Sequence, residues 1–477
     1  MRPSMQISVL ALMAMHLGQF AVAEKVLGAF IFARHGDRTP KVLGHTQLTD
    51  LGYSEVYQTG SYYHDRYIDA SSSLHIEGIS DEVVKLSQID AATPSDNVLQ
   101  SSALGFLQGV YPPVGSAANQ TLGNGTTVKA PLHGYQLIPL SLVSSGTKSE
   151  DNTWLQDATG CTNAKVSSNN YYSSSLYNDL YKSTEDFYKS LSPMLDGAFP
   201  ESDISFRHAY TIFDYLNVAK IHNTSNTPTD EQLYQLFRLA NVEQYNLAYN
   251  TSDPIRAIAG SQLAGEMLQA LNKTITTKAK TKLNIQFGSY GTFLSYFGLA
   301  QLPTVNVDFT GIPDYASSMA WELVTNSTSD DFPSTSEIGV RFVFHNGTIT
   351  GSDAPKEYPL YNQSSTVIPW SDFVEKTKKI AITSNDEWCK ACGNSDHTCS
   401  SGSSRGSDSG SGAVGASSKD VGGVSRPVAG VIGAMVTLAV ILGLEALILA
   451  VGGFRIAKKR GTGANVPAPS VAENKIV

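Results

Sequence analysis

The sequence predicts a mixed α/β protein in which a central sheet is flanked by helices and carries a helical insert. Three observations indicate this architecture. A nearly continuous apolar block, residues 26–33, suits a buried strand that is covered on both faces. Apolar residues recur at helical spacing through residues 170–278, and residues 338–344 alternate in the manner of an antiparallel strand.

The body of the protein is expected to span residues 24–399 of the 477-residue chain. This length is too great for one simple core and suits two lobes. We assign residues 24–169 and 279–399 to the α/β domain and residues 170–278 to the helical insert. The net charge of −9 and the lack of a basic patch argue against nucleic-acid binding.

Residues 1–23 have the pattern of a secretory signal peptide. Arg2 precedes an apolar stretch, residues 7–17, and residues 21–23 read Ala-Val-Ala, which suits cleavage. Eight N-x-S/T glycosylation motifs follow, and their density favours a glycosylated lumenal or extracellular body. Their acceptor residues are Asn119, Asn124, Asn223, Asn250, Asn272, Asn326, Asn346 and Asn362.

The most informative stretch is residues 34–40, Arg-His-Gly-Asp-Arg-Thr-Pro, directly after the predicted strand. Ligands of open α/β sheets bind beyond the carboxyl ends of strands, so His35 would emerge where a substrate can reach it. Arg34 and Arg38 flank this imidazole, and a guanidinium binds phosphate oxygens in a bidentate way. A neutral imidazole can attack phosphorus while the arginines neutralise charge. The alternative is a surface turn held by a salt bridge within the motif.

The motif resembles that of the fungal-type histidine acid phosphatases, in the branch of the histidine phosphatase superfamily that includes phytases. The resemblance continues through residues 48–49, Leu-Thr, at a helix start and, in weaker form, to about residue 395. It implies that His35 is the nucleophile and that Arg34 and Arg38 bind phosphate. It also implies an α/β sheet domain with a helical insert, acidic operating conditions and no cofactor or metal.

One departure from the family pattern concerns a third phosphate-binding arginine. Family members usually carry it at the end of a second strand, before a helix, but the corresponding residues 85–97 contain no arginine. Thr93 as a helix cap and Pro94 at the first helical position would still offer a helix N-terminus whose N–H groups can contact an anion. Asp96 nearby would oppose this contact.

A second departure concerns the family's His-Asp pair, which supplies a phosphate contact and the proton donor. Ser289-Tyr290 stands in its place, shortly before an apolar helix at residues 293–299. We consider Asp37, Asp96 and Tyr290 as replacement acids. A positioned general acid contributes about 10²- to 10⁴-fold and an aimed charge-stabilising donor about 10²- to 10³-fold, so the two losses weaken the predicted site.

Two local signals define further elements. Residues 229–232, Thr-Asp-Glu-Gln, have the capping-box pattern and are followed by a helical stripe. Residues 338–344 lead into Asn346-Gly347, a good hairpin turn, which predicts an antiparallel edge.

The four cysteines are Cys161, Cys389, Cys392 and Cys399. In an oxidising compartment they are expected to form two disulfides, and three pairings are possible. A zinc site that includes His397 is the alternative, but its one-residue gap to Cys399 misses the usual ligand spacing.

Residues 428–454 are predicted to form a transmembrane helix interrupted by one charge, Glu445. At 1.5 Å per residue the segment spans about 40 Å, enough to cross a bilayer core of roughly 30 Å with tilt. Basic residues follow at once, which places the tail, residues 455–477, in the cytosol. A GPI signal is the alternative, but such signals end in a hydrophobic stretch. Residues 400–427, rich in Ser and Gly, would form a flexible tether.

These features predict a single-pass membrane protein whose body lies outside the cytosol, at the cell surface or in a secretory or vacuolar lumen. The expected activity is hydrolysis of small-molecule phosphate monoesters through a phosphohistidine on His35. The alternative is a catalytically degenerate member that binds a phosphorylated ligand or acts as a glycosylated surface protein. Arg34, His35 and Arg38 favour catalysis, whereas Ser289-Tyr290 and the missing arginine favour the alternative.

Overall fold

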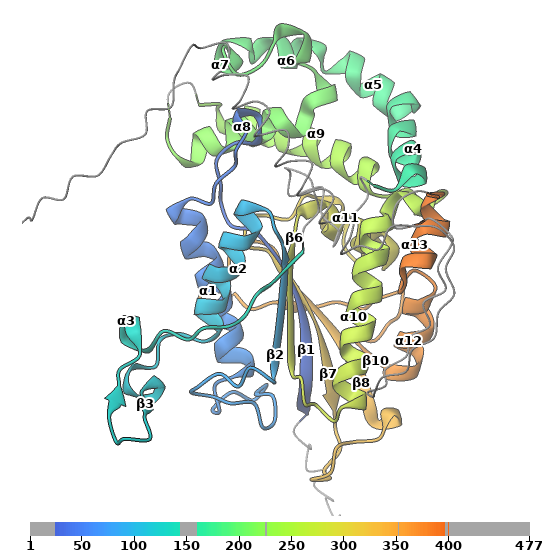
Figure 1. Cartoon of the computed structure of the whole chain (residues 1–477). Coiled ribbons are helices and arrows are strands. Elements are labelled where there is room, and N and C mark those ends of the chain that lie inside the picture. The colour runs from blue at the N-terminus through green and yellow to red at the C-terminus, as the bar shows by residue number, and fades with distance from the viewer. Residues whose placement is uncertain (1–23, 144–159, 225–226, 352, 396–398, 400–477) are drawn as a thin grey trace, which may run out of the picture. The chain divides into compact units, whose positions relative to one another are not determined.

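The described part of the chain is the body alone. The computed structural model in Figure 1 describes residues 24–143, 160–224, 227–351, 353–395 and 399. The predicted signal peptide, tether, transmembrane helix and cytosolic tail all lie outside these residues. Within them, no helix combines the length and the apolarity that crossing a bilayer requires.

Strand β1 (Lys25–Arg34) forms the centre of the sheet, as the apolar block predicts. It pairs in parallel with β6 (Leu283–Gly288) and antiparallel with β7 (Ser318–Thr325). Its side chains alternate between two hydrophobic clusters, one on each face of the sheet. Almost every residue of β1 is buried for this reason, which confirms a strand covered on both sides.

The remaining strands complete a mixed sheet. They are β2 (Ile89–Pro94), β5 (Ser141–Val143), β8 (Ile338–His345), β9 (Lys356–Glu357) and β10 (Val367–Pro369), with a separate pair formed by β3 (Gln120–Thr121) and β4 (Thr127–Val128). The order in the sheet is β10, β8, β7, β1, β6, β2, β5, and β9 pairs with β8. The half from β1 to β5 is parallel, and the half from β7 outward is antiparallel. The predicted mixed sheet is confirmed.

Helices cover both faces of this sheet (Figure 1). They are α1 (Asp50–Tyr67), α2 (Asn97–Val110), α3 (Pro131–Gly134), α4 (Thr162–Asn170), α5 (Ser175–Ser183), α6 (Glu185–Ser190), α7 (Ser192–Leu195), α8 (Ala209–Ile221), α9 (Asp230–Ala248), α10 (Ile258–Thr276), α11 (Tyr290–Leu299), α12 (Trp370–Lys378) and α13 (Asn385–Cys392). Apolar side chains of α1 and α2 pack on one face, and those of α10, α11 and α12 pack on the other.

Helices α4 to α9 gather beyond the end of the sheet where β1 and β6 finish (Figure 1). Several of them share a hydrophobic cluster of their own, distinct from the two sheet clusters. Helix α9 begins with the predicted capping box between Thr229 and Gln232. Helix α10 instead packs against β1, and all described residues belong to one compact unit. The division into an α/β domain and an insert at residues 170–278 therefore stays a prediction.

The connection after β8 differs from the predicted hairpin. Gly347 has the expected positive φ of 90°, but the next strand begins only at Lys356, so a longer loop follows. Asn346 is engaged elsewhere, because its side-chain oxygen accepts a hydrogen bond of 2.8 Å from the backbone N–H of Asp314. The strand itself is confirmed, and it pairs antiparallel with β7 and β10.

Two disulfides form among the four cysteines, and the structure settles the pairing. Cys161, before α4, is bonded to Cys392 at the end of α13, and both are fully buried. Cys389 is bonded to Cys399. The first bond joins segments 231 residues apart in sequence, whereas the second closes a separation of only 10 residues.

Replacing Cys161 and Cys392 together by alanine should lower the free energy of unfolding by about 2–5 kcal/mol, because a disulfide that closes a long loop restricts the unfolded chain. Denaturant unfolding of the oxidised protein measures this change. The matched control replaces Cys389 and Cys399, whose short loop predicts a smaller loss. A larger loss in the control would contradict the argument from loop length.

Candidate active site

Strands β1 and β6 end side by side, and this fixes the place of the motif. Arg34 is paired with Gly288 in the parallel ladder, so His35 and Ser289 leave the sheet at the same edge. Helix α11 begins directly afterwards at Tyr290. The position that the resemblance assigns to the His-Asp pair therefore lies beside His35, as the sequence predicts.

The loop that carries His35 lies directly against the first turn of α1. A Cβ atom on Gly36 would lie 2.2 Å from the carbonyl oxygen of Gly52, and one on Gly52 would lie 2.0 Å from that of Asp37. The Thr49 N–H donates to the Asp37 carbonyl at 3.0 Å, and the Thr49 hydroxyl caps α1 through Gly52. Gly36 is needed here for close approach of two backbones.

The imidazole of His35 is fully buried at this edge. Its Nδ1 lies 2.8 Å from the Gly36 carbonyl, which assigns the proton to Nδ1 and the lone pair to Nε2. Burial, followed by the positive charges of Arg34, Arg38 and Lys41, holds the pKa of His35 well below 6.5. The ring is therefore neutral, as a nucleophile must be, even under mildly acidic conditions.

Arg34 meets neutral partners. Its guanidinium donates to the carbonyl of Pro313 and lies over two aromatic rings, at 5.4 Å from the centre of Tyr290 and 4.8 Å from that of Tyr315. Its Nε is buried and has no hydrogen-bond partner among the described residues. Cation–π contacts and a carbonyl leave the net charge of the guanidinium in place.

Arg38 meets a carboxylate instead. Its Nη1 lies 3.1 Å from Oδ2 of Asp214 on α8, and its Nη2 lies 3.0 Å from Oδ1. The same Nη2 donates to the Tyr210 hydroxyl at 3.1 Å. The side chains of Arg38 and Asp214 are 0% and 3% exposed, so this is a buried, bidentate ion pair. The surface turn with a salt bridge inside the motif is therefore wrong.

All three motif side chains converge on Tyr315. Its ring centre lies 5.6 Å from that of His35, and 4.8 and 5.9 Å from the guanidinium carbons of Arg34 and Arg38. The cavity between Arg34, Asp214 and Tyr315 measures about 20 Å³. Such a volume holds roughly one water molecule. The side chains of Arg34, His35 and Arg38 are thus brought together around one tyrosine ring.

Lys41 is a third cation at this place. It follows the motif directly in η1 (Lys41–Leu43), and its ammonium lies 5.3 Å and 5.5 Å from the ring centres of Tyr210 and Tyr290. Its charge also lowers the pKa of His35. We expected the replacement for the third arginine at the helix start after β2. Lys41, one position past the motif, was a visible signal in the sequence.

The side chain of Asp37, a predicted proton donor, is held by residues that neighbour the loop. Its buried carboxylate accepts from the Thr49 hydroxyl and lies 2.7 Å from Nε2 of His222. Its backbone N–H donates to Oε2 of Glu55 at 2.7 Å. Burial raises the pKa of Glu55 to about 7, so this residue of α1 is a further acid close to the motif. No pattern in the sequence pointed to Glu55.

The other two predicted acids also have structural partners. Asp96 caps α2 by accepting from the Leu99 N–H at 3.0 Å. The Tyr290 hydroxyl donates to Oε1 of Gln244 at 2.9 Å. Which residue donates the proton stays a prediction for all three candidates.

The predicted start of the second helix is wrong by three residues. Pro94 is the last residue of β2, because the parallel ladder continues to Val143 of β5, and α2 begins at Asn97 with Asp96 as its cap. Thr93 therefore does not cap the helix. It is fully buried, and its hydroxyl has no hydrogen-bond partner among the described residues.

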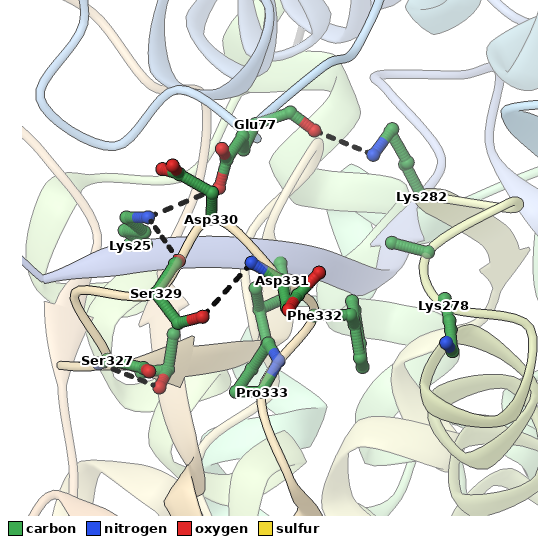
Figure 2. Close-up of a pocket in the computed structure, with 13 residues that line it drawn as sticks. Lys25, Glu77, Lys278, Lys282, Ser327, Ser329, Asp330, Asp331, Phe332 and Pro333 are labelled. Atoms are coloured by element: carbon green, nitrogen blue, oxygen red, sulfur yellow. Dashed lines mark hydrogen bonds and ion pairs between the residues drawn. The ribbon is translucent and has the colours of Figure 1, made fainter.

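A separate pocket lies at the opposite end of β1 (Figure 2). Two of its three lysines are already engaged: Lys25 contacts Glu77 and the Ser329 carbonyl, and Lys282 donates to the Glu77 carbonyl. Acidic side chains of Asp330 and Asp331 face the same space. This mixed lining does not form a phosphate site. Among the described residues, no group of three or more metal-binding side chains is placed to hold an ion.

Replacing His35 by glutamine should change how stability depends on pH. At pH values between the lowered pKa of His35 in the folded protein and 6.5, His35 is protonated in the unfolded state but not in the folded state. The contribution of His35 to the free energy of unfolding therefore decreases as pH falls through this range. The unfolding free energy of the wild type minus that of His35→Gln should decrease below pH 6.5, with a slope approaching about 1.4 kcal/mol per pH unit. Denaturant melts from pH 7.5 to 4.5 measure it.

The matched control is His133→Gln, since His133 is exposed. The decrease for His35→Gln should exceed any change seen in this control. A difference for His35→Gln that stays flat with pH would show that this imidazole titrates alike in both states.

Comparison with known proteins agrees with this geometry. The family model described as histidine phosphatase superfamily (branch 2) matches residues 42–345. The match begins at the second residue of η1, just after the motif. No curated protein sequence matches the chain.

Solved structures share the fold at low identity. The apo phytase of Hafnia alvei is 13% identical with a TM-score of 0.51, over 78% of this chain and 98% of that one. The phytase of Klebsiella sp. ASR1 is 10% identical with a TM-score of 0.50, over 75% of this chain and 96% of that one. With most of the body matched by the family model, the chain belongs to branch 2 of the histidine phosphatase superfamily.

Proposed function

We propose that this protein hydrolyses phosphate monoesters through a phosphohistidine on His35. One observation carries the proposal: a neutral, buried imidazole lies among Arg34, Arg38 and Lys41 at the carboxyl edge of the sheet. Cations in a buried site stabilise the charge that develops on the equatorial oxygens of a transferring phosphoryl group. Family membership supports the same chemistry.

The reaction would proceed in two displacements. Nε2 of His35 attacks phosphorus, the bond to the ester oxygen breaks, and the alcohol leaves with a proton from a general acid. The conjugate base of that acid then takes a proton from a water molecule as the water oxygen attacks the phosphohistidine. The N–P bond breaks, and inorganic phosphate leaves with His35 neutral and the acid protonated again. Asp37, Asp96 and Tyr290 are the acids proposed from sequence, and Glu55, with a pKa of about 7, joins them.

We place the organic part of the substrate in an open groove beside the small cavity that Arg34 and Tyr315 line. This groove measures about 780 Å³, and Ile312 and Pro313 line both spaces. Its lining includes the rings of Phe309 and Tyr358 and the side chain of Arg238. An aromatic lining with a few polar groups is the usual character of a small-molecule site.

We also infer that the body lies outside the cytosol on a single-pass anchor. Two disulfides support an oxidising compartment. All eight glycosylation-motif asparagines are accessible: Asn119 and Asn250 are half-buried and the other six are exposed. The argument for the anchor is the apolar stretch at residues 428–454.

The second candidate function is binding of a phosphorylated ligand without turnover. The guanidinium of Arg38, which Asp214 already occupies, favours it. It differs from the first in a single measurable property, which is the dependence of any hydrolysis on the His35 imidazole.

Hydrolysis of p-nitrophenyl phosphate by the purified body, from pH 3 to 7, tests the proposal. We expect His35→Ala to lose at least about 10³-fold in kcat/KM, since it removes the nucleophile. His133→Ala is the matched control and should retain activity. Equal background rates for wild type and His35→Ala would end the hydrolase proposal. Protection against thermal unfolding by inorganic phosphate without turnover would support the binding function instead.

Replacing Lys41 by methionine should lower kcat/KM by about 10²-fold, the effect of removing one charge-stabilising donor. Methionine keeps a similar apolar stem, and the Lys41 backbone N–H that donates to Asp214 at 2.9 Å is unchanged. The same assay measures the loss, with exposed Lys129→Met as the matched control. Equal activity in both variants would show that Lys41 does not act on the phosphate.

A further inference from the structure

The anion-binding groups of the motif already hold an anion from the protein itself. Both carboxylate oxygens of Asp214 are bound by the guanidinium of Arg38, at 3.0 and 3.1 Å. One of them, Oδ2, also accepts from the backbone N–H of Lys41 at 2.9 Å. A guanidinium fork and a backbone N–H are the donors that proteins use to bind phosphate oxygens.

The guanidinium fork of Arg38 is occupied at the same time. Both of its terminal nitrogens bind Asp214, and Nη2 also binds the Tyr210 hydroxyl. A phosphoryl group on His35 can therefore be bound by this fork only if Arg38 exchanges its partner. Because the buried Arg38 cannot be left without an anionic partner, the incoming phosphate must take the place of Asp214 as that partner.

The helix that carries Asp214 can move relative to Arg38. It lies on α8, outside the sheet, whereas Arg38 belongs to the loop held rigidly between β1 and α1. The Tyr210 hydroxyl on α8 also contacts Arg38, and the Tyr210 N–H is held by Glu243 of α9 at 2.8 Å. Release of Arg38 would therefore loosen two contacts of α8 together.

We propose that Asp214 is a displaceable internal ligand: substrate phosphate replaces its carboxylate on Arg38, and α8 moves away as the site opens. The inference rests on the proposed function, since it assigns phosphate to Arg38. The competing role is a fixed one, in which Asp214 only orients the guanidinium and stays in place when phosphate binds.

Affinity for inorganic phosphate separates the two roles, because it needs no turnover. Asp214→Asn keeps the shape of the side chain and removes its charge. Displacement predicts that the Kd for phosphate falls by about tenfold, equivalent to about 1.4 kcal/mol, whereas a fixed orienting role predicts weaker binding. Titration calorimetry on the full-length protein measures it. An unchanged or raised Kd overturns the inference.

Two matched controls exclude a general charge effect. Asp314→Asn removes an exposed carboxylate that lines the same cavity, and Asp179→Asn removes one from α5 in the helical region. Neither should match the effect of Asp214→Asn. Equal tightening in Asp314→Asn would overturn the inference, because electrostatic attraction would then explain the change.

Hydrogen exchange in the wild type gives a second readout that does not depend on the variant folding. Displacement predicts faster amide exchange in α8 when inorganic phosphate is added, and a fixed Asp214 predicts equal or slower exchange. Equal or slower exchange overturns the inference. Failure of phosphate to bind to both wild type and Asp214→Asn would overturn the phosphate site itself, and the inference with it.

Discussion

Two buried guanidinium groups beside a neutral imidazole are the constraint on which the rest of the site depends. Neither Arg34 nor Arg38 can lose its charge, so each needs partners once it leaves water. Arg34 finds a carbonyl and two ring faces, and Arg38 finds the carboxylate of Asp214. Burial of the imidazole, followed by the positive charges of the guanidinium groups, keeps the imidazole neutral. Burial thus accounts both for the nucleophilic state of His35 and for the need of the arginines for internal partners.

The scaffold makes this arrangement possible by holding the loop from two sides. The ladder between β1 and β6 sets where His35 leaves the sheet, and the backbone contact between Gly36 and Gly52 fixes the loop on α1. Helix α8 meets the loop through side chains instead, those of Asp214 and Tyr210 and that of His222 at the end of the helix. The fixed part of the site carries the predicted nucleophile, and the separately anchored part carries the internal anion.

The sequence was sufficient for the local part of this picture. The apolar strand, the motif at its end and the position of Ser289-Tyr290 follow from short-range patterns, and the structure places them as expected. Asp214 was out of reach because it lies 176 residues after Arg38, and a single aspartate inside a helical stripe looks like any solvent-facing residue. The prediction of where α2 starts was wrong for a related reason. Pairing of β2 with β5 keeps Thr93 and Pro94 in a strand, despite their helix-start pattern.

The unequal partners of the two arginines imply an order of events when phosphate arrives. Among the residues that the structure describes, no carboxylate is paired with Arg34, so its charge supplies the first attraction for an entering dianion. Arg38 is neutralised at rest and can contribute only by exchanging one anion for another. An exchange of this kind favours a ligand that offers two oxygens to the guanidinium fork and still reaches Arg34, as a phosphate monoester does. A single carboxylate would satisfy one arginine and leave the other, so the internal ligand would also select against the simplest competing anions.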